Sequence, residues 1–218
     1  MFFLKGKLYK FFLLTVLLCL SKFSFAQQDL IEEIVVTGSY IKTTSKKDTS
    51  PVDIILRDEI DGIGAFLASD ITRNLSINSG SENNTDAFTS GSTQGTSNIN
   101  LRGLGLSSTL VLIDGRRQTV TGATANDGSV FVNTSAIPLI AIQRVEVLKE
   151  GAASIYGSDA VAGVVNYIFR RGFEGFELDI SDKRTEKGNQ KDQSISFILG
   201  NQSNSLQWVL AASALNRT

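Results

Sequence analysis

Three segments near the C-terminal end of the chain alternate apolar and polar residues, which is the two-residue period of a β-strand with one buried face. Polar stretches at 183–191 and 200–205 separate the segments. The pattern predicts an antiparallel meander, which is typical of transmembrane β-barrels and also of soluble β-sandwiches. The apolar positions are Phe176, Leu178 and Ile180, then Ile195, Phe197 and Leu199, then Trp208, Leu210, Ala212 and Ala214.

The region before these segments has a different texture, with short apolar runs separated by turn-forming residues. The Asp114-Gly115 pair lies between two extended runs and predicts a tight hairpin turn that returns the chain through 116–120. Two long polar stretches, 76–98 and 121–129, predict loops. These elements predict an α+β domain. The expected strands are 52–56, 98–101, 109–113, 144–148 and 163–169, the expected helix is 64–75, and helical turns are expected after Asn133 and at 152–156.

The N-terminus has the three parts of a secretory signal. Three lysines form a basic start, residues 11–20 are apolar, and Ser24-Phe25-Ala26 offers a cleavage site. A membrane anchor is the alternative, but the uncharged stretch ends at Lys22, short of the roughly 20 apolar residues that a spanning helix needs. We therefore predict that residues 1–26 are a signal peptide, and the mature chain begins with a polar segment, 27–50.

The composition excludes several classes of function. The chain has no His, and its single Cys, Cys19, lies in the predicted signal peptide. A mature chain without Cys or His has no disulfide framework, no Cys/His zinc site and no His base or Cys nucleophile. Loss of the lysine-rich signal leaves the mature chain mildly acidic, which argues against a dedicated nucleic-acid binder. Since no pair of catalytic carboxylates stands out either, we predict that the protein is not an enzyme and uses no cofactor or metal.

Two segments in the middle of the chain carry the most specific motifs. The first runs from Asn98 to Arg116 and contains the Arg102-Gly103 pair. The second runs from Arg144 to Asn166 and contains Arg-Val-Glu-Val-Leu-Lys-Glu-Gly. Together they resemble the plug domain of TonB-dependent outer-membrane receptors. The resemblance implies an α+β plug domain at 51–172, followed at 173–218 by the first strands of an antiparallel transmembrane β-barrel. That barrel is incomplete, because single-chain barrels begin at about eight strands.

A short apolar island in the polar N-terminal segment resembles the TonB box. β-Branched residues favour an extended strand, and a free strand near the N-terminus can add to the edge of a partner's sheet. The first strand of the plug sheet is the alternative interpretation of the same residues. The predicted TonB-binding residues are Glu32, Glu33, Ile34, Val35, Val36, Thr37 and Gly38.

The resemblance also implies gating or structural roles for residues of the plug. It gives Arg102 a salt bridge to acidic residues inside the barrel wall, whereas the residues alone also allow a surface arginine before a turn. The glycines of the second segment suit tight turns and close packing. The full set is Arg102, Gly103, Asp114, Gly115, Arg116, Arg144, Glu146, Gly151, Tyr156 and Gly157.

The two polar loops are the candidate ligand-facing apices. Phe88, Asn126 and Asp127 could contact a polar substrate, and a loop without any ligand role is the alternative. Many siderophore receptors carry Arg-Gly-Pro where this chain has Lys149-Glu150-Gly151. The resemblance therefore favours a carbohydrate or another nutrient over an iron-siderophore.

The resemblance implies the N-terminal part of a receptor for active nutrient uptake powered by the proton gradient. Its partners would be TonB with the inner-membrane energising complex, outer-membrane lipid and an extracellular nutrient, with no nucleic acid. It would lie in the outer membrane of a Gram-negative bacterium, with the plug and TonB box accessible from the periplasm. The alternative is a truncated secreted plug-like binding module, or a fragment without transport activity.

Overall fold

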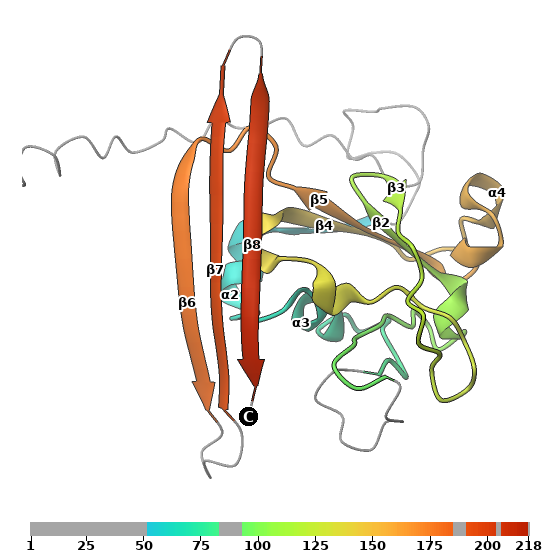
Figure 1. Cartoon of the computed structure of the whole chain (residues 1–218). Coiled ribbons are helices and arrows are strands. Elements are labelled where there is room, and N and C mark those ends of the chain that lie inside the picture. The colour runs from blue at the N-terminus through green and yellow to red at the C-terminus, as the bar shows by residue number, and fades with distance from the viewer. Residues whose placement is uncertain (1–51, 83–92, 185–190, 204–205, 218) are drawn as a thin grey trace, which may run out of the picture. The chain divides into compact units, whose positions relative to one another are not determined.

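The computed structural model describes residues 52–82, 93–184, 191–203 and 206–217. The predicted signal peptide and TonB box lie outside these ranges. The described residues form two sheets (Figure 1): a five-stranded sheet of order β1-β4-β5-β2-β3, and a three-stranded sheet of order β6-β7-β8. We call the part that contains the first sheet the mixed-sheet domain.

The mixed-sheet domain combines antiparallel pairs with one parallel pair, β2 with β5. Its strands are β1 Val52–Leu56, β2 Thr109–Ile113, β3 Arg116–Arg117, β4 Ile142–Leu148 and β5 Gly163–Phe169. Its helices are α2 Arg57–Gly62, α3 Ala68–Arg73 and α4 Ala153–Tyr156, with 3₁₀ turns η1 Leu106–Ser108, η2 Thr134–Ala136, η3 Leu139–Ala141 and η4 Ser158–Ala160. The α+β prediction is confirmed, as are the strands at 52–56, 109–113 and 163–169.

One face of the five-stranded sheet packs against α2 and α3. Successive side chains of a strand point to opposite faces, so alternate residues of the central strands meet these helices. Each such side chain contributes about 1.5–3 kcal/mol when fully buried. The buried cluster comprises Val111, Val145, Val147, Val165 and Tyr167 from the strands, Ile60, Ala68 and Ile71 from the helices, and Ile99, Leu101, Ile137, Ile142 and Ala162 from their surroundings.

The opposite face of the sheet has a smaller apolar cluster. Leu110, Leu112, Leu148 and Val164 pack there against the two alanines that flank α4, Ala152 and Ala160. The same face of β4 carries Arg144 and Glu146, which are 9% and 0% exposed. A charged pair is therefore buried on the sheet beside an apolar cluster.

Two sequence predictions for this domain are wrong. The helix expected at 64–75 begins only at Ala68, because the Asp70 carboxylate accepts hydrogen bonds from the backbone N–H groups of Phe66 and Leu67 and caps the helix there. Residues 98–101 are not a strand, since Leu101 makes a single isolated bridge to Asn78. Side chains satisfy this backbone instead: the Asn78 Oδ1 accepts from the N–H of Asn100 at 3.0 Å.

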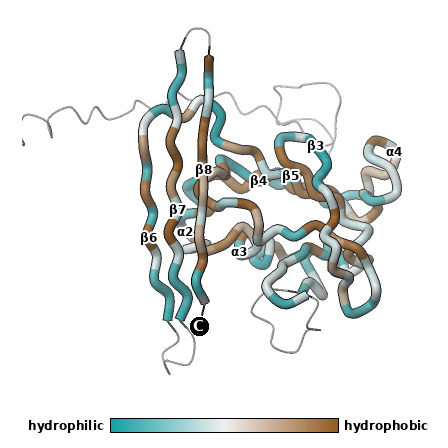
Figure 2. The backbone as a smooth tube through the Cα atoms, viewed as in Figure 1, coloured by the Kyte–Doolittle hydropathy of each residue, from teal (hydrophilic) through white to brown (hydrophobic). Residues whose placement is uncertain are grey.

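The three-stranded sheet is a meander of β6 Gly175–Arg184, β7 Lys191–Gln202 and β8 Gln207–Arg217. Its register aligns apolar residues of neighbouring strands in rows, such as Phe176 with Leu199 and Leu199 with Leu210. Many of these side chains are exposed: Phe176 is 64% and Ile180 is 71% exposed. Figure 2 shows the hydrophobic positions in the middle of the strands, with hydrophilic ends around the β6–β7 connection. The predicted alternation is confirmed.

The other face of this sheet is mostly polar. Asp179, Ser196 and Ser213 are aligned across it in one row. They line a cavity of about 670 Å³ together with Arg57, Phe66 and other residues of the mixed-sheet domain. The sheet thus presents a polar face to the mixed-sheet domain and an apolar face outward. Within the described residues, none of the helices has the length and hydrophobicity to cross a membrane.

Gly163 provides a test of the packing between β4, β5 and the 98–101 segment. Its φ is +144°, and an added Cβ would lie 2.5 Å from the Leu148 carbonyl oxygen and 2.8 Å from Leu101 Cδ1. We expect Gly163→Ala to destabilise the fold by at least about 2 kcal/mol in denaturant unfolding, because both the clash and the backbone strain must be absorbed. Gly62→Ala is the control, since its Cβ would meet no atom within 4 Å. Equal stability of the two variants would contradict the packing.

The apolar outer face predicts different behaviour for two lengths of the chain. We expect residues 27–172 to be monodisperse in buffer, whereas 27–218 should aggregate without detergent through its apolar face and unpaired strand edges. Light scattering of both, with and without detergent, checks this. A monodisperse 27–218 in plain buffer would count against a membrane role for the three strands.

Candidate functional site

Arg102 and Gly103 form a sharp bend that holds the loop before β5. Both have positive φ, +58° and +66°, which is uncommon for a residue other than glycine. The bend directs the Arg102 guanidinium at two backbone carbonyls: Nη2 donates to Val161 at 2.9 Å and Nε to Ala162 at 3.2 Å. Among the described residues Arg102 thus serves as a brace, and its salt bridge to a barrel wall stays a prediction.

Asp114 and Gly115 form the predicted hairpin turn between β2 and β3. Their φ values, +50° and +77°, match the two positive φ angles of a type I′ turn. The turn is fastened to β5, because Asp114 Oδ1 accepts from the N–H of Phe169 at 3.1 Å and the N–H of Gly115 donates to Asn166 Oδ1 at 3.0 Å. Arg116 is exposed, and its strand β3 is shorter than the expected 116–120.

Arg144 and Glu146 form the buried ion pair of the central strand β4. The Arg144 Nη2 lies 2.9 Å and its Nε 3.0 Å from Glu146 Oε1. Asn166 of the neighbouring strand β5 donates from Nδ2 to Glu146 Oε2 at 3.5 Å. Since Asn166 also accepts from Gly115, the ion pair is connected to the hairpin turn. Glu146 is fully buried and does not lie at a solvent-exposed strand edge.

The remaining candidates of the second motif lie around α4. Gly151 is required by close approach, since an added Cβ would lie 3.0 Å from the Val161 carbonyl oxygen. Gly157 ends α4 with a φ of +87°. The Tyr156 carbonyl accepts from Arg117, whose Nη1 also pairs with Asp159 at 2.6 Å. Gly151, Tyr156 and Gly157 thus shape a loop that Arg102 and Arg117 hold against the sheet.

The two predicted apical loops are brought together by Glu82. Its backbone N–H donates to Asn98 Oδ1 at 2.7 Å, and its Oε1 accepts from the N–H of Asn126 at 3.3 Å. Neither Glu82 nor Asn98 was among the sequence candidates. They are 16 residues apart in the chain, and only the fold brings them into contact. Phe88 lies outside the described residues.

Polar groups lie both beneath and on the surface of these loops. The Glu82 Oε2 and Asn98 Nδ2 atoms are buried and have no hydrogen-bond partner in the described part of the chain. Asp127 is exposed, and hydrogen bonds from the side chain and backbone of Ser129 lower the pKa of its carboxyl group. The loops therefore present carboxylate and amide groups. The described residues contain no group of three or more His, Cys, Asp or Glu side chains placed to hold a metal ion.

A family model described as the TonB-dependent Receptor Plug Domain matches residues 44–164. The chain belongs to this family. The mixed-sheet domain is therefore the plug, and the braced loops and the buried ion pair described above are features of a plug.

Solved receptors share this fold. The siderophore receptor PirA from Pseudomonas aeruginosa matches with a TM-score of 0.54 and 23% identity over 78% of this chain and 30% of that chain. A mutant of the ferric enterobactin receptor PfeA from the same organism, in complex with enterobactin, matches with a TM-score of 0.56 and 22% identity over 78% of this chain and 25% of that chain. The unliganded ferric citrate transporter FecA gives 0.59 and 20% over 78% and 26%. The chain thus spans about a quarter to a third of these receptors.

The ion pair in the plug gives a direct stability test. We expect Glu146→Ala to cost about 3–5 kcal/mol, because it leaves the Arg144 guanidinium buried without its carboxylate. Asp159→Ala breaks the exposed pair with Arg117, 48% and 55% exposed, and should cost less than about 1 kcal/mol. Denaturant unfolding of both variants in detergent measures the difference. Similar values would show that burial of the pair has no energetic weight.

Proposed function

We propose that the chain is the N-terminal part of an outer-membrane receptor that takes up a nutrient with energy delivered by TonB. The observation that carries the proposal is a plug followed directly by three antiparallel strands with an apolar outer face. Such a face suits a lipid environment, whereas a secreted soluble module would expose it to water at an energetic cost. This supports the receptor over the secreted plug-like module.

The proposed transport step uses strand addition. Residues Glu32–Gly38 pair in the periplasm with the sheet edge of TonB, which the inner-membrane complex energises with the proton gradient. The pull is transmitted along 39–51 to β1, which begins at Val52. The plug then shifts or partly unfolds inside the barrel, and the nutrient enters. The chain itself supplies binding and a movable gate rather than chemistry.

The proposed substrate site is the pair of loops that Glu82 joins. Polar ligand groups could engage the exposed Asn126 and Asp127, while Glu82 and Asn98 beneath them hold the loops together. Ferric chelates are the first class to test, because the receptors of similar fold are named for siderophores and ferric citrate.

One observation favours a second class, neutral polyhydroxylated nutrients such as oligosaccharides. Residues 74–101 and 118–143 contain no Lys or Arg, while Glu82, Asp86 and Asp127 are acidic. Anionic chelates gain no attraction from such loops, whereas hydroxyl groups can donate to the carboxylates. This agrees with the Lys149-Glu150-Gly151 sequence, which favours a nutrient other than an iron-siderophore.

The TonB box can be tested in the full-length receptor. We expect Val35→Pro to abolish energised uptake and to leave substrate binding intact, because proline removes a strand N–H that addition to the TonB sheet needs. Ser45→Pro, in the polar linker, is the matched control and should transport normally. Uptake of radiolabelled ferric chelates and of labelled oligosaccharides, compared with binding at 4 °C without energy, separates the two steps. Unchanged uptake by Val35→Pro would refute the box assignment.

A further inference from the structure

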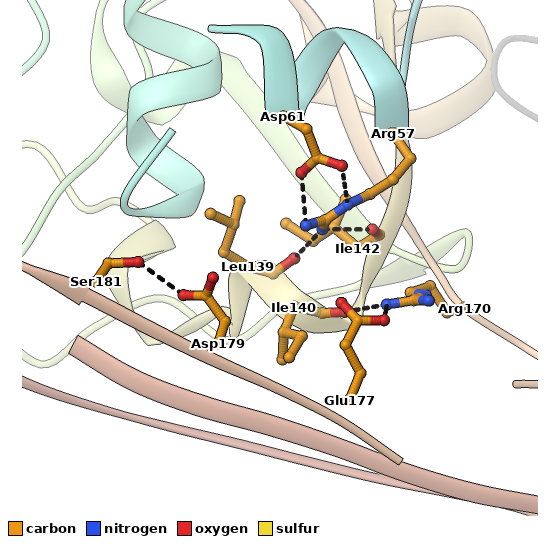
Figure 3. A network of polar contacts seen from close by, with 9 residues as sticks. All are labelled: Arg57, Asp61, Leu139, Ile140, Ile142, Arg170, Glu177, Asp179 and Ser181. Atoms are coloured by element: carbon orange, nitrogen blue, oxygen red, sulfur yellow. Dashed lines mark hydrogen bonds and ion pairs between the residues drawn. The ribbon is translucent and has the colours of Figure 1, made fainter. Parts of the chain in front are cut away.

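The short segment Leu139–Ile142, between the loop after η2 and the central strand β4, is held by arginines from two directions. Arg57 is the first residue of α2, and Arg170 follows β5 (Figure 3). Both guanidinium groups donate to backbone carbonyls of this segment. The carbonyls of Leu139 and Ile140 belong to the 3₁₀ turn η3, and that of Ile142 lies at the bulge in the β4–β5 pairing between Ile142 and Arg144. Backbone groups in such places need partners outside the regular ladder.

Arg57 of α2 binds the two ends of the segment. Its Nη1 donates to the carbonyl of Leu139 at 2.9 Å and to that of Ile142 at 3.3 Å. Its remaining donors engage Asp61 one helical turn later, with Nη2 at 2.7 Å from Oδ1 and Nε at 3.2 Å from Oδ2. This fork-to-fork pair fixes the orientation of the guanidinium. Arg57 thus ties α2, the first helix after β1, to a segment about eighty residues away in the chain.

Arg170 holds the segment from the side of the three-stranded sheet. Its backbone N–H donates to the Ala141 carbonyl at 2.8 Å, and Nη1 lies 3.4 Å from the Ile140 carbonyl oxygen. The same Nη1 pairs with Glu177 Oε2 of β6 at 2.8 Å. The guanidinium also lies over the Phe173 ring, 4.5 Å from its centre, which suits a cation–π contact. Arg170 therefore connects the segment to the first of the three outer strands.

We propose that Arg57, the Leu139–Ile142 segment and Arg170 form a mechanical clamp that joins the pulled end of the plug to the barrel. The inference rests on the proposed function, in which TonB pulls on residues before β1. Strand β1 is an edge strand that pairs only with β4 in the five-stranded sheet, so this one ladder is the first part of the plug to bear the load. Once β1 has separated, the load reaches Arg57, whose contacts with Leu139, Ile142 and Asp61 must break together. The clamp sets the load at which α2 leaves the rest of the plug.

The test is single-molecule pulling on the full-length receptor, with its barrel held in a bilayer and a handle at the mature N-terminus. We expect Arg57→Met to raise the rate of the first unfolding event at constant force by about tenfold or more, because two charge-assisted hydrogen bonds to carbonyls are lost. Arg73→Met is the matched control. Arg73 is also helical and paired with an aspartate, Asp70 at 3.6 Å, but its side chain is 52% exposed and donates to no carbonyl within the described residues. The first unfolding event of Arg73→Met should occur at the wild-type rate.

Two further measurements keep the outcome decisive. Arg57→Lys retains the charge but lacks the fork, so its rate should fall between those of the wild type and Arg57→Met; it replaces the Met variant if that variant does not fold. Ion conductance without load reports whether the plug still closes the barrel. Equal unfolding rates for Arg57→Met, Arg57→Lys and Arg73→Met would overturn the clamp.

Because the handle replaces TonB, faster unfolding of an Arg57 variant would support the clamp even if Val35→Pro showed that the TonB box lies elsewhere.

Discussion

Burial of the central strand β4 on both faces is the constraint on which the plug depends. The strand pairs with β1 on one side and β5 on the other, and its alternate residues serve two different interiors. Val145 and Val147 face the helices and contribute ordinary hydrophobic burial. Arg144 and Glu146 face the other way and must satisfy each other, because an isolated buried charge costs several kcal/mol. Asn166 hydrogen-bonds to both Glu146 and the Asp114-Gly115 turn, so the hairpin is linked to the buried ion pair.

The strands were the most predictable part of the chain. Dense β-branched runs such as Gly163–Phe169 and the two-residue alternation of β6–β8 depend on local sequence, and both are present as expected. The helix at 64–75 was misplaced because the Asp70 carboxylate starts it later than the apolar spacing indicates. The strand at 98–101 was wrong because side chains take its backbone hydrogen bonds: Asn78, 22 residues away, accepts from Asn100, and Thr109, eight residues away, accepts from Leu101.

For the site, too, residues with a local signal could be predicted and residues that depend on distant contacts could not. The Asp114-Gly115 turn and the glycines around α4 carry local signals, and resemblance to the plug identified Arg102, Arg144 and Glu146 as important. No local pattern marks Glu82, Arg57 or Arg170, because each matters through a partner in another part of the fold. The backbone carbonyls that Arg57 and Arg170 bind leave no trace in the sequence, although each arginine also pairs with a carboxylate. Such residues emerge only when the backbone is placed in three dimensions.

The position of β1 at the sheet's edge has a consequence for repeated use. In the proposed transport cycle, the plug must return to its starting state each time a nutrient has passed. If β1 departs, the pairings β4–β5, β5–β2 and β2–β3 do not involve it, and the remaining sheet keeps an exposed edge on β4. The inward and outward alternation of β4 then admits β1 in one register, since a shift by one residue would turn its apolar side chains away from the core. Under the proposed function, the exposed edge of β4 is therefore the template on which β1 re-forms its pairing.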